Sequence, residues 1–387
     1  MKLAQRMSRL GTETAFDVLA RAKAMEAKGR KIIHLEIGEP DFDTPPNIVN
    51  AAIEALRAGH THYTPANGIL PLRETIAEEV AGTRDIPVHP DQVVVVPGAK
   101  PIMFFVLLAL CETGDEVIYP NPGFPIYESM IKFVGATPVP IRLSMDRGFS
   151  FDLDEFRSLV TERTRLIILN SPANPTGGVL SAYDLAQVAE VALAHNIPVL
   201  ADEIYSHILY GETFASIATV PGMQELTIIL DGYSKTYAMT GWRMGYGVMP
   251  VELARQITKL MVNSNSCTAA FTQMAGIQAL KGPQDAPKAM VDAFRRRRDL
   301  IVAGLNEIPG FQCLLPKGAF YVFPNIEGTG KTSQELADYL LEEAGVALLS
   351  GTCFGAYGEG FLRLSYANSE ENISKALGQI KDAVARL

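Results

Sequence analysis

Three side chains of different chemistry follow three separate apolar runs in this chain. Asn174 lies in the loop after residues 166–169, Asp202 directly follows residues 197–201, and Lys235 comes five positions after Leu230. Short apolar runs rich in β-branched residues are typical of strands buried on both faces of a parallel sheet. Ligands of such sheets bind beyond the carboxyl ends of the strands. The pattern therefore predicts that an amide, a carboxylate and an amine converge on one site.

This set of side chains suits the chemistry of pyridoxal 5'-phosphate. Lys235, in apolar surroundings, is a candidate for a lowered pKa and for a covalent bond to the cofactor's aldehyde. Asp202 would keep the ring nitrogen protonated, so that the ring can accept electrons from a carbanion. Asn174 and Tyr205 can donate hydrogen bonds to the phenolate oxygen. We therefore expect these four residues to hold the reactive end of the cofactor.

The cofactor's phosphate and ring faces need further contacts. We expect the phosphate at the start of the helix that follows Gly98, where the backbone N–H groups of Ala99 and Lys100 are free. Arg243 would supply the counter-charge. Two apolar side chains near these groups could pack on the two faces of the ring, Ile204 and Phe124.

Six sequence strings stand in one order along the chain: IGEPDFDTP (37–45), YTPANGILPLRE (63–74), SPANPTGG (171–178), ADEIY (201–205), SKTYAMTGWRMGY (234–246) and FLRLSYA (361–367). Together they resemble the class I/II aminotransferases, pyridoxal-phosphate enzymes of fold type I, over nearly the whole chain. The resemblance implies that Arg363 binds the substrate α-carboxylate, with the backbone N–H of Gly38 and with Asn174. It also implies that Tyr63 reaches the phosphate of a neighbouring subunit, and hence a homodimer with shared active sites.

In detail the chain is most similar to the bacterial aspartate aminotransferase subgroup, in which the phosphate turn reads GAK, as at 98–100 here. The resemblance implies that Lys100 pairs with the distal carboxylate of aspartate or glutamate. A solvent-exposed lysine at a helix start is the competing interpretation. Two departures stand out. Gly232 replaces a serine that contacts the phosphate in many members, and Phe124 replaces a Tyr or Trp, which leaves the preference for acidic substrates open.

The expected reaction is ping-pong transfer of an amino group from an L-amino acid, aspartate or a similar acidic donor, to a 2-oxo acid such as 2-oxoglutarate. An aminotransferase for aromatic, alanine or other neutral amino acids is the alternative, as is a β-lyase on the same fold. A non-catalytic cofactor-binding regulator is disfavoured because Lys235, Asp202 and Arg363 are all present and no DNA-binding extension is evident.

Alternation of apolar runs with helical patterns predicts an α/β fold. We expect a large domain with a mostly parallel sheet between helices, as in fold type I, and a smaller α+β domain. The predicted division is an N-terminal arm at 1–14, a discontinuous small domain at 15–46 and 290–387, and a large cofactor-binding domain at 47–289.

The overall composition narrows the possible partners and compartment. The 387 residues are 48% apolar and carry a net charge of −9, which disfavours binding to nucleic acid or to anionic membrane surfaces. The longest apolar run, 102–111, is about half of the roughly 20 residues that a membrane span needs. The N-terminus lacks the apolar region of a signal peptide. Four cysteines without a CxxC pair suit reduced thiols in a cytoplasmic protein.

Two other motifs favour structural interpretations. His60 and His62 have a spacing that can bind a metal on a strand, but no third ligand is evident, so we expect a solvated loop and no metal site. The four consecutive arginines at 295–298 point around a predicted helix, so a solvated surface is favoured over a basic binding patch.

Overall fold

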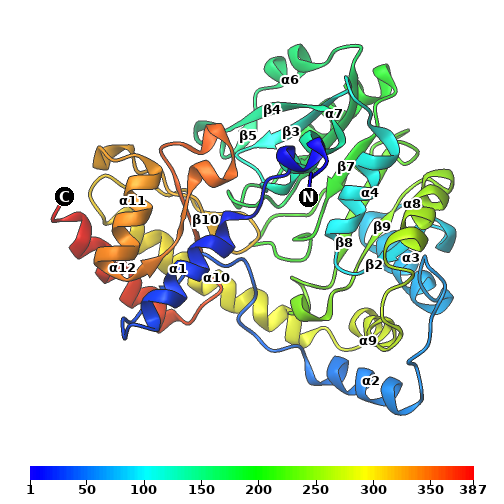
Figure 1. Ribbon diagram of the computed structural model, residues 1–387, viewed down its shortest axis with the longest axis horizontal. Coiled ribbons are helices and arrows are strands. Elements are labelled where there is room, and N and C mark those ends of the chain that lie inside the picture. Colours follow the sequence, from blue (N-terminus) through cyan, green and yellow to red (C-terminus); the bar gives the residue numbers. More distant parts are fainter.

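Eight strands form the central sheet of the computed structural model, which describes residues 1–387 (Figure 1). Their order is β2-β9-β8-β7-β6-β3-β4-β5. β9 is antiparallel to both of its neighbours and β5 is antiparallel to β4, whereas the strands from β8 to β4 are parallel. The mostly parallel sheet is therefore confirmed. The strands are β2 (Val93–Val96), β3 (Glu116–Asn121), β4 (Thr137–Ser144), β5 (Ser150–Phe151), β6 (Thr164–Asn170), β7 (Val199–Asp202), β8 (Thr227–Gly232) and β9 (Gly245–Val248).

Helices cover both faces of this sheet. Alternate residues of a strand point to opposite faces. Val94 and Val96 accordingly pack in one apolar cluster with α4 and α8, and Val93 and Val95 pack in another with α2, α3 and α9. This double burial is why the strands are continuous apolar runs. The helices are α2 (Pro46–Arg57), α3 (Leu70–Arg84), α4 (Lys100–Leu110), α5 (Ile126–Val134), α6 (Leu153–Leu159), α7 (Ala182–His195), α8 (Val251–Ser264) and α9 (Ala270–Lys281).

Residues 14–34 and the segment from residue 285 onward lie together in a second, smaller part of the molecule, whereas residues 5–11 lie against the helix at 126–134 of the large part (Figure 1). β1 pairs in parallel with β11, and β13 lies antiparallel between β10 and β12. A cluster of 30 buried residues forms most of its core. Its elements are α1 (Thr14–Glu26), β1 (Ile33–His34), α10 (Asp285–Asn306), β10 (Tyr321–Val322), α11 (Ser333–Tyr339), β11 (Val346–Ala347), β12 (Leu349–Ser350), β13 (Leu362–Ser365) and α12 (Glu370–Val384). The predicted boundary between residues 289 and 290 falls inside α10, which is continuous there. The division into domains given above therefore stays a prediction.

Single turns of tighter or wider helix complete the secondary structure. A π-helical turn follows α11 at Leu340–Ala344. The 3₁₀ segments are Gln5–Arg9, Pro90–Gln92, Met145–Arg147, Ile217–Thr219, Thr240–Trp242, Glu327–Thr329, Gly351–Phe354 and Ala356–Gly358. None of the helices combines the length and the apolar character needed to cross a membrane.

The expectation that all four arginines at 295–298 are solvated is wrong for two of them. Arg297 and Arg298 are only 9% and 7% exposed. Arg297 forms an ion pair with Asp41 at 2.7 Å, and Arg298 donates a hydrogen bond to the carbonyl of Pro316 at 3.1 Å. Successive residues of a helix are about 100° apart around its axis. One half of the run therefore faces solvent, while the other half anchors α10 to its neighbours.

Candidate functional site

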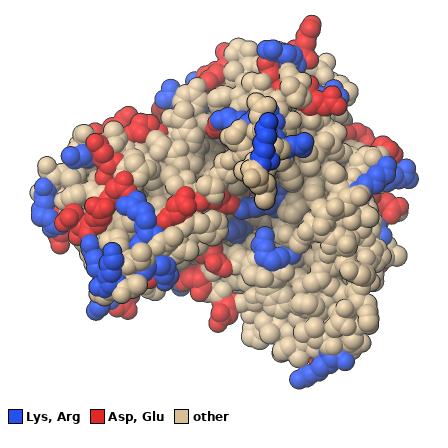
Figure 2. All heavy atoms as spheres, in the orientation of Figure 1, with Lys and Arg blue, Asp and Glu red and all other residues tan.

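A cavity of about 480 Å³ opens between the central sheet and the smaller part of the molecule, and eleven of the thirteen predicted site residues line it. Such a volume suits a small-molecule ligand. Figure 2 shows basic side chains in the hollowed middle of this face, although the protein is acidic as a whole. The eleven are Gly38, Ala99, Lys100, Phe124, Asn174, Asp202, Ile204, Tyr205, Lys235, Arg243 and Arg363.

Lys235 lies in the loop that follows β8, with its amine facing the cavity. Its Nζ donates a hydrogen bond to the carbonyl of Gly38 at 2.5 Å and lies 6.0 Å from the ring centre of Tyr205. Burial lowers the pKa of Lys235 to about 8, and the positive charges of Lys100 and Arg363 act in the same direction. At neutral pH about a tenth of this amine is therefore unprotonated and able to act as a nucleophile or base.

Asp202 is the last residue of β7 and is 6% exposed. One carboxylate oxygen accepts a hydrogen bond from the hydroxyl of Tyr127 at 2.6 Å, and the other accepts one from the backbone N–H of Ile204 at 3.3 Å. Burial raises the pKa of Asp202 to about 6. The group is thus a buried carboxylate at neutral pH, suited to pairing with a protonated nitrogen.

Asn174 is held in place by its backbone, which leaves its side chain for a ligand. Its N–H donates to the side-chain oxygen of Asn170 at 2.9 Å, while its own side-chain oxygen is buried without a partner. Nearby, the hydroxyl groups of Tyr205 and Tyr321 form a hydrogen bond of 2.7 Å. Buried polar atoms in native proteins are nearly always hydrogen-bonded, so the unpaired amide oxygen points to a bound polar group.

Arg363 projects from β13 and is 3% exposed. Its guanidinium lies over the rings of Tyr321 and Phe354, with 4.8 and 5.2 Å to the ring centres, and it donates to the carbonyl of Glu36. Its Nε is buried without a partner. A buried guanidinium that lacks an anion is unfavourable. This residue is therefore suited to binding a carboxylate from the cavity.

An anion site lies where α4 begins. Gly98 has a φ of 80°, and the guanidinium of Arg243 contacts it so closely that a side chain at position 98 would overlap it. The first N–H groups of a helix have no partner within the helix. Ser234 lines the same cavity. Two free backbone donors and one arginine together provide what a phosphate needs.

The glycine at 232, one of the two departures from the resemblance described above, has a packing reason. A Cβ built on Gly232 would lie 2.9 Å from the Cα of Gly245 on the neighbouring strand. A serine at 232 would therefore push β9 away. Gly245 on that strand packs closely on Ala99, since a Cβ built at 245 would lie 2.6 Å from the backbone N of Ala99, and this contact would shift as well.

Lys100 is half-exposed at the edge of the cavity, where it is paired. Its ammonium contacts the carboxylate of Glu13 and lies 5.3 Å from the ring centre of Phe124. Glu13 directly precedes α1, and it lines the cavity together with the first three residues of that helix, Thr14, Ala15 and Phe16.

Two predicted residues lie outside the lining. Gly98 supports the site through its contact with Arg243. Tyr63 is 89% exposed and does not reach this cavity within its own chain. Conversely, the sequence reasoning missed several polar residues of the lining, most of which meet the site through contacts between distant parts of the chain: Glu13, Thr14, Glu39, Tyr127, Asn170, Ser234, Thr240 and Tyr321. Only Ser234, adjacent to Lys235, carried a local signal. No cluster of three or more metal-ligating side chains is present.

Comparisons with known proteins agree with this geometry. The sequence model of the family described as aminotransferase class I and II matches residues 30–380. A probable aspartate/prephenate aminotransferase of Aquifex aeolicus is 40% identical over 392 residues, which cover 100% of this chain and 99% of that protein. The solved aspartate aminotransferase of Rhizobium meliloti has a TM-score of 0.96 at 38% identity, with 100% of both chains covered. An aromatic aminotransferase of Pyrococcus horikoshii has a TM-score of 0.90 at 38% identity, with 95% and 99% covered.

The lowered pKa of Lys235 can be tested directly by competitive acetylation of the protein freed of bound small molecules. We expect the labelling rate of Lys235 to rise through a pH of about 8, because its neutral form appears there. Lys381, with a side chain 53% exposed, is the internal control for the labelling reaction. Mass spectrometry of the labelled peptides gives both curves, and identical curves would contradict the prediction.

Proposed function

The chain belongs to the family of class I and II aminotransferases, and from this we infer that its cavity binds pyridoxal 5'-phosphate and exchanges an amino group between an L-amino acid and a 2-oxo acid. The observation that carries this proposal is the set of groups that face one cavity: a buried carboxylate at Asp202, an amine of lowered pKa at Lys235, and unpaired buried polar atoms on Asn174 and Arg363.

The residues present fit this cofactor. The start of α4 and Arg243 would hold the phosphate, and Asp202 would hold the ring nitrogen. The side-chain N–H of Asn174 and the hydroxyl of Tyr205 would donate hydrogen bonds to the phenolate oxygen. Ile204 and Phe124 line the cavity and would pack on the ring, and Lys235 would bond to the aldehyde. When bound, the cofactor supplies a carbonyl that accepts an amino group and a ring that accepts electrons from the substrate Cα.

Different residues of the chain would bind the substrate and transfer its proton. Arg363 would bind the α-carboxylate through paired N–H donors, helped by Asn174 and the backbone N–H of Gly38. This fixes which bond at Cα faces Lys235. Lys235 would remove and return the Cα proton as general base and acid, for which a pKa of about 8 is well matched to neutral pH. Transfer in two half-reactions, first from the donor and then to the acceptor, gives ping-pong kinetics.

We propose aspartate or a similar acidic amino acid as donor, with 2-oxoglutarate or a similar acceptor. The relatives that carry the name aspartate aminotransferase and the presence of Lys100 at the cavity support this choice. Without substrate, the Glu13 carboxylate pairs with Lys100. The distal carboxylate of an acidic substrate would take the place of Glu13, whereas a neutral substrate would leave the pair intact.

We also propose that the enzyme is a cytoplasmic homodimer. Tyr63 is 89% exposed in the single chain, so its side chain is accessible to a second subunit. In the dimer it would reach the phosphate bound by the partner subunit. The four cysteines are free, which suits a reducing compartment.

The proposed activity predicts a stoichiometric half-reaction. Mixing purified enzyme with each L-amino acid, in the absence of an acceptor, should convert the bound cofactor to its amine form, which is followed by absorbance. We expect acidic donors to react fastest. Lys235→Ala should show no turnover of the cofactor. If no amino acid converts the cofactor, or if pyruvate and ammonia form catalytically without an acceptor, the proposal is wrong.

Lys100→Ala tests the substrate class. We expect kcat/KM for aspartate to fall at least about tenfold more than kcat/KM for alanine or phenylalanine, because a charge-assisted hydrogen bond contributes roughly 1.5–3 kcal/mol. Lys132→Ala is the matched control, since Lys132 has the same side-chain exposure of 48% and also pairs with a glutamate, but lies outside this cavity. Equal losses for both substrates would contradict the role of Lys100.

Shared active sites predict complementation between two defective subunits. Lys235→Ala and Tyr63→Ala dimers should each be impaired, and reassociation of a mixture should restore activity. The mixed dimer would contain one intact site, formed by Lys235 of one subunit and Tyr63 of the other. Sedimentation checks the mass of two 42.0 kDa chains. A mixture no more active than the sum of its components would contradict the shared site.

A further inference from the structure

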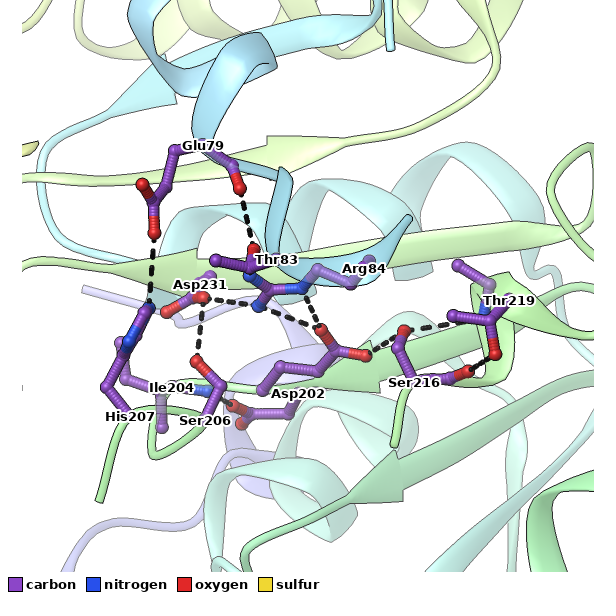
Figure 3. A network of polar contacts seen from close by, with 12 residues as sticks. Glu79, Thr83, Arg84, Asp202, Ile204, Ser206, His207, Ser216, Thr219 and Asp231 are labelled. Carbon is purple, nitrogen blue, oxygen red and sulfur yellow. Dashed lines mark hydrogen bonds and ion pairs between the residues drawn. The ribbon is translucent and has the colours of Figure 1, made fainter. Parts of the chain in front are cut away.

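A buried set of charges lies next to the cavity but does not line it (Figure 3). Arg84, the last residue of α3, is 3% exposed. It contacts two buried carboxylates at once, with Nε 3.0 Å from Glu203 and Nη2 2.8 Å from Asp231. Ser206 donates a further hydrogen bond to Asp231, and Ser216 donates one to Glu203. These five residues are buried and form a polar network, which continues from Arg84 Nη1 to the exposed Thr83 at 2.7 Å.

The two carboxylates of this network flank Asp202. Glu203 is its neighbour in the chain, and its N–H donates to the carbonyl of Leu230 on β8 at 2.9 Å. Leu230 is the residue paired with Asp202 across the sheet, and Asp231 is the next residue along β8. Arg84 therefore joins the two strand ends that carry Asp202 and lead to Lys235.

The charges of the network act on Asp202. Burial is the main reason that the pKa of Asp202 is raised, and the negative charges of Asp231 and Glu203 raise it further. Arg84 opposes both of these charges. Although burial disfavours its charged form, Glu203 and Asp231 raise the pKa of Arg84, so it is a permanent cation.

Other groups face Asp202 from the elements around it. Tyr127 on α5 donates a hydrogen bond to it, and Tyr205 lies nearby with a pKa raised by burial. Lys235 and Arg243 face it across the cavity. Beyond the network, His207 lies 3.6 Å from Glu79. None of these groups contacts Glu203 or Asp231 as Arg84 does.

We propose that Arg84 is a positioning residue for the reaction: by neutralising Glu203 and Asp231 behind Asp202, it keeps Asp202 a carboxylate that can hold the protonated ring nitrogen of the cofactor. This inference rests on the proposed use of pyridoxal phosphate. Arg84 touches neither cofactor nor substrate, and it acts through the charge and the position of Asp202. Without it, the two buried carboxylates of Glu203 and Asp231 would lose the cation that contacts them.

The test is a pH titration of the holoenzyme and of its Arg84→Met variant. We expect the acid limb of kcat/KM to move to higher pH by roughly one unit, a tenfold change in the protonation equilibrium. A second readout needs no substrate: the pH below which dialysed holoenzyme loses its cofactor, followed by absorbance, should rise by a similar amount. Arg84→Lys, which keeps the charge, should restore both values in large part.

Variants that remove one of the carboxylates should move the two pH transitions in the opposite direction. Glu203→Gln should move both transitions to lower pH, and Asp231→Asn added to Arg84→Met should return them toward the wild-type values. If Arg84→Met does not fold, Glu203→Gln and Asp231→Asn alone decide the sign. Arg298→Met is the matched control, because Arg298 is also buried, at 7% exposed, but belongs to the small part. It should lower the thermal stability and leave both transitions unmoved.

The outcomes separate this inference from the proposed function. If Arg84→Met lowers only thermal stability, as the control does, or if Glu203→Gln raises the transitions, the inference is overturned. If wild-type protein binds no pyridoxal phosphate at all, the proposed function itself fails.

Discussion

Burial of a carboxylate at the end of β7 is the constraint on which the site depends. A buried ionised carboxylate is strongly unfavourable unless hydrogen bonds and a cation compensate it. The hydroxyl of Tyr127 and the N–H of Ile204 supply part of this compensation to Asp202, and its raised pKa shows that the compensation is incomplete. A ligand with a protonated nitrogen would complete it. The same requirement applies to the neighbouring carboxylates of Glu203 and Asp231, which are compensated by the guanidinium of Arg84.

Basic side chains gather at the cavity although the chain as a whole is acidic. The chain carries a net charge of −9, yet four cations face the cavity, and Arg363 is buried with an unpaired Nε. Placed cations of this kind bind a phosphate or a carboxylate regardless of the net charge, because local fields in a low-dielectric cleft exceed the distant ones. Desolvation and these neighbours also lower the pKa of Lys235, so one arrangement both attracts anions and activates the amine.

The site needs both parts of the fold. Lys235 and Asp202 come from the ends of parallel strands, whereas Arg363 comes from β13, and Gly38 and Glu13 come from the first 45 residues. The hydrogen bond from Lys235 to Gly38 crosses this boundary. A change in how the two parts pack would therefore alter substrate binding without touching the sheet that holds the cofactor groups.

Local pattern was enough to predict the strands, the edge of the sheet at which the polar groups meet, and the residues directly after those strands. These features depend on the periodicity of apolar residues and on neighbours in the chain. Local pattern could not predict contacts between distant positions. Tyr127 and Asp202 are 75 positions apart, and Lys100 and Glu13 are 87 positions apart. Arg84 is 119 positions from Glu203 and 147 from Asp231. The sequence by itself determined which chemistry the strand ends carry. Only the tertiary structure decided which charges are buried together, because burial sets the electrostatic cost and depends on how helices pack against the sheet.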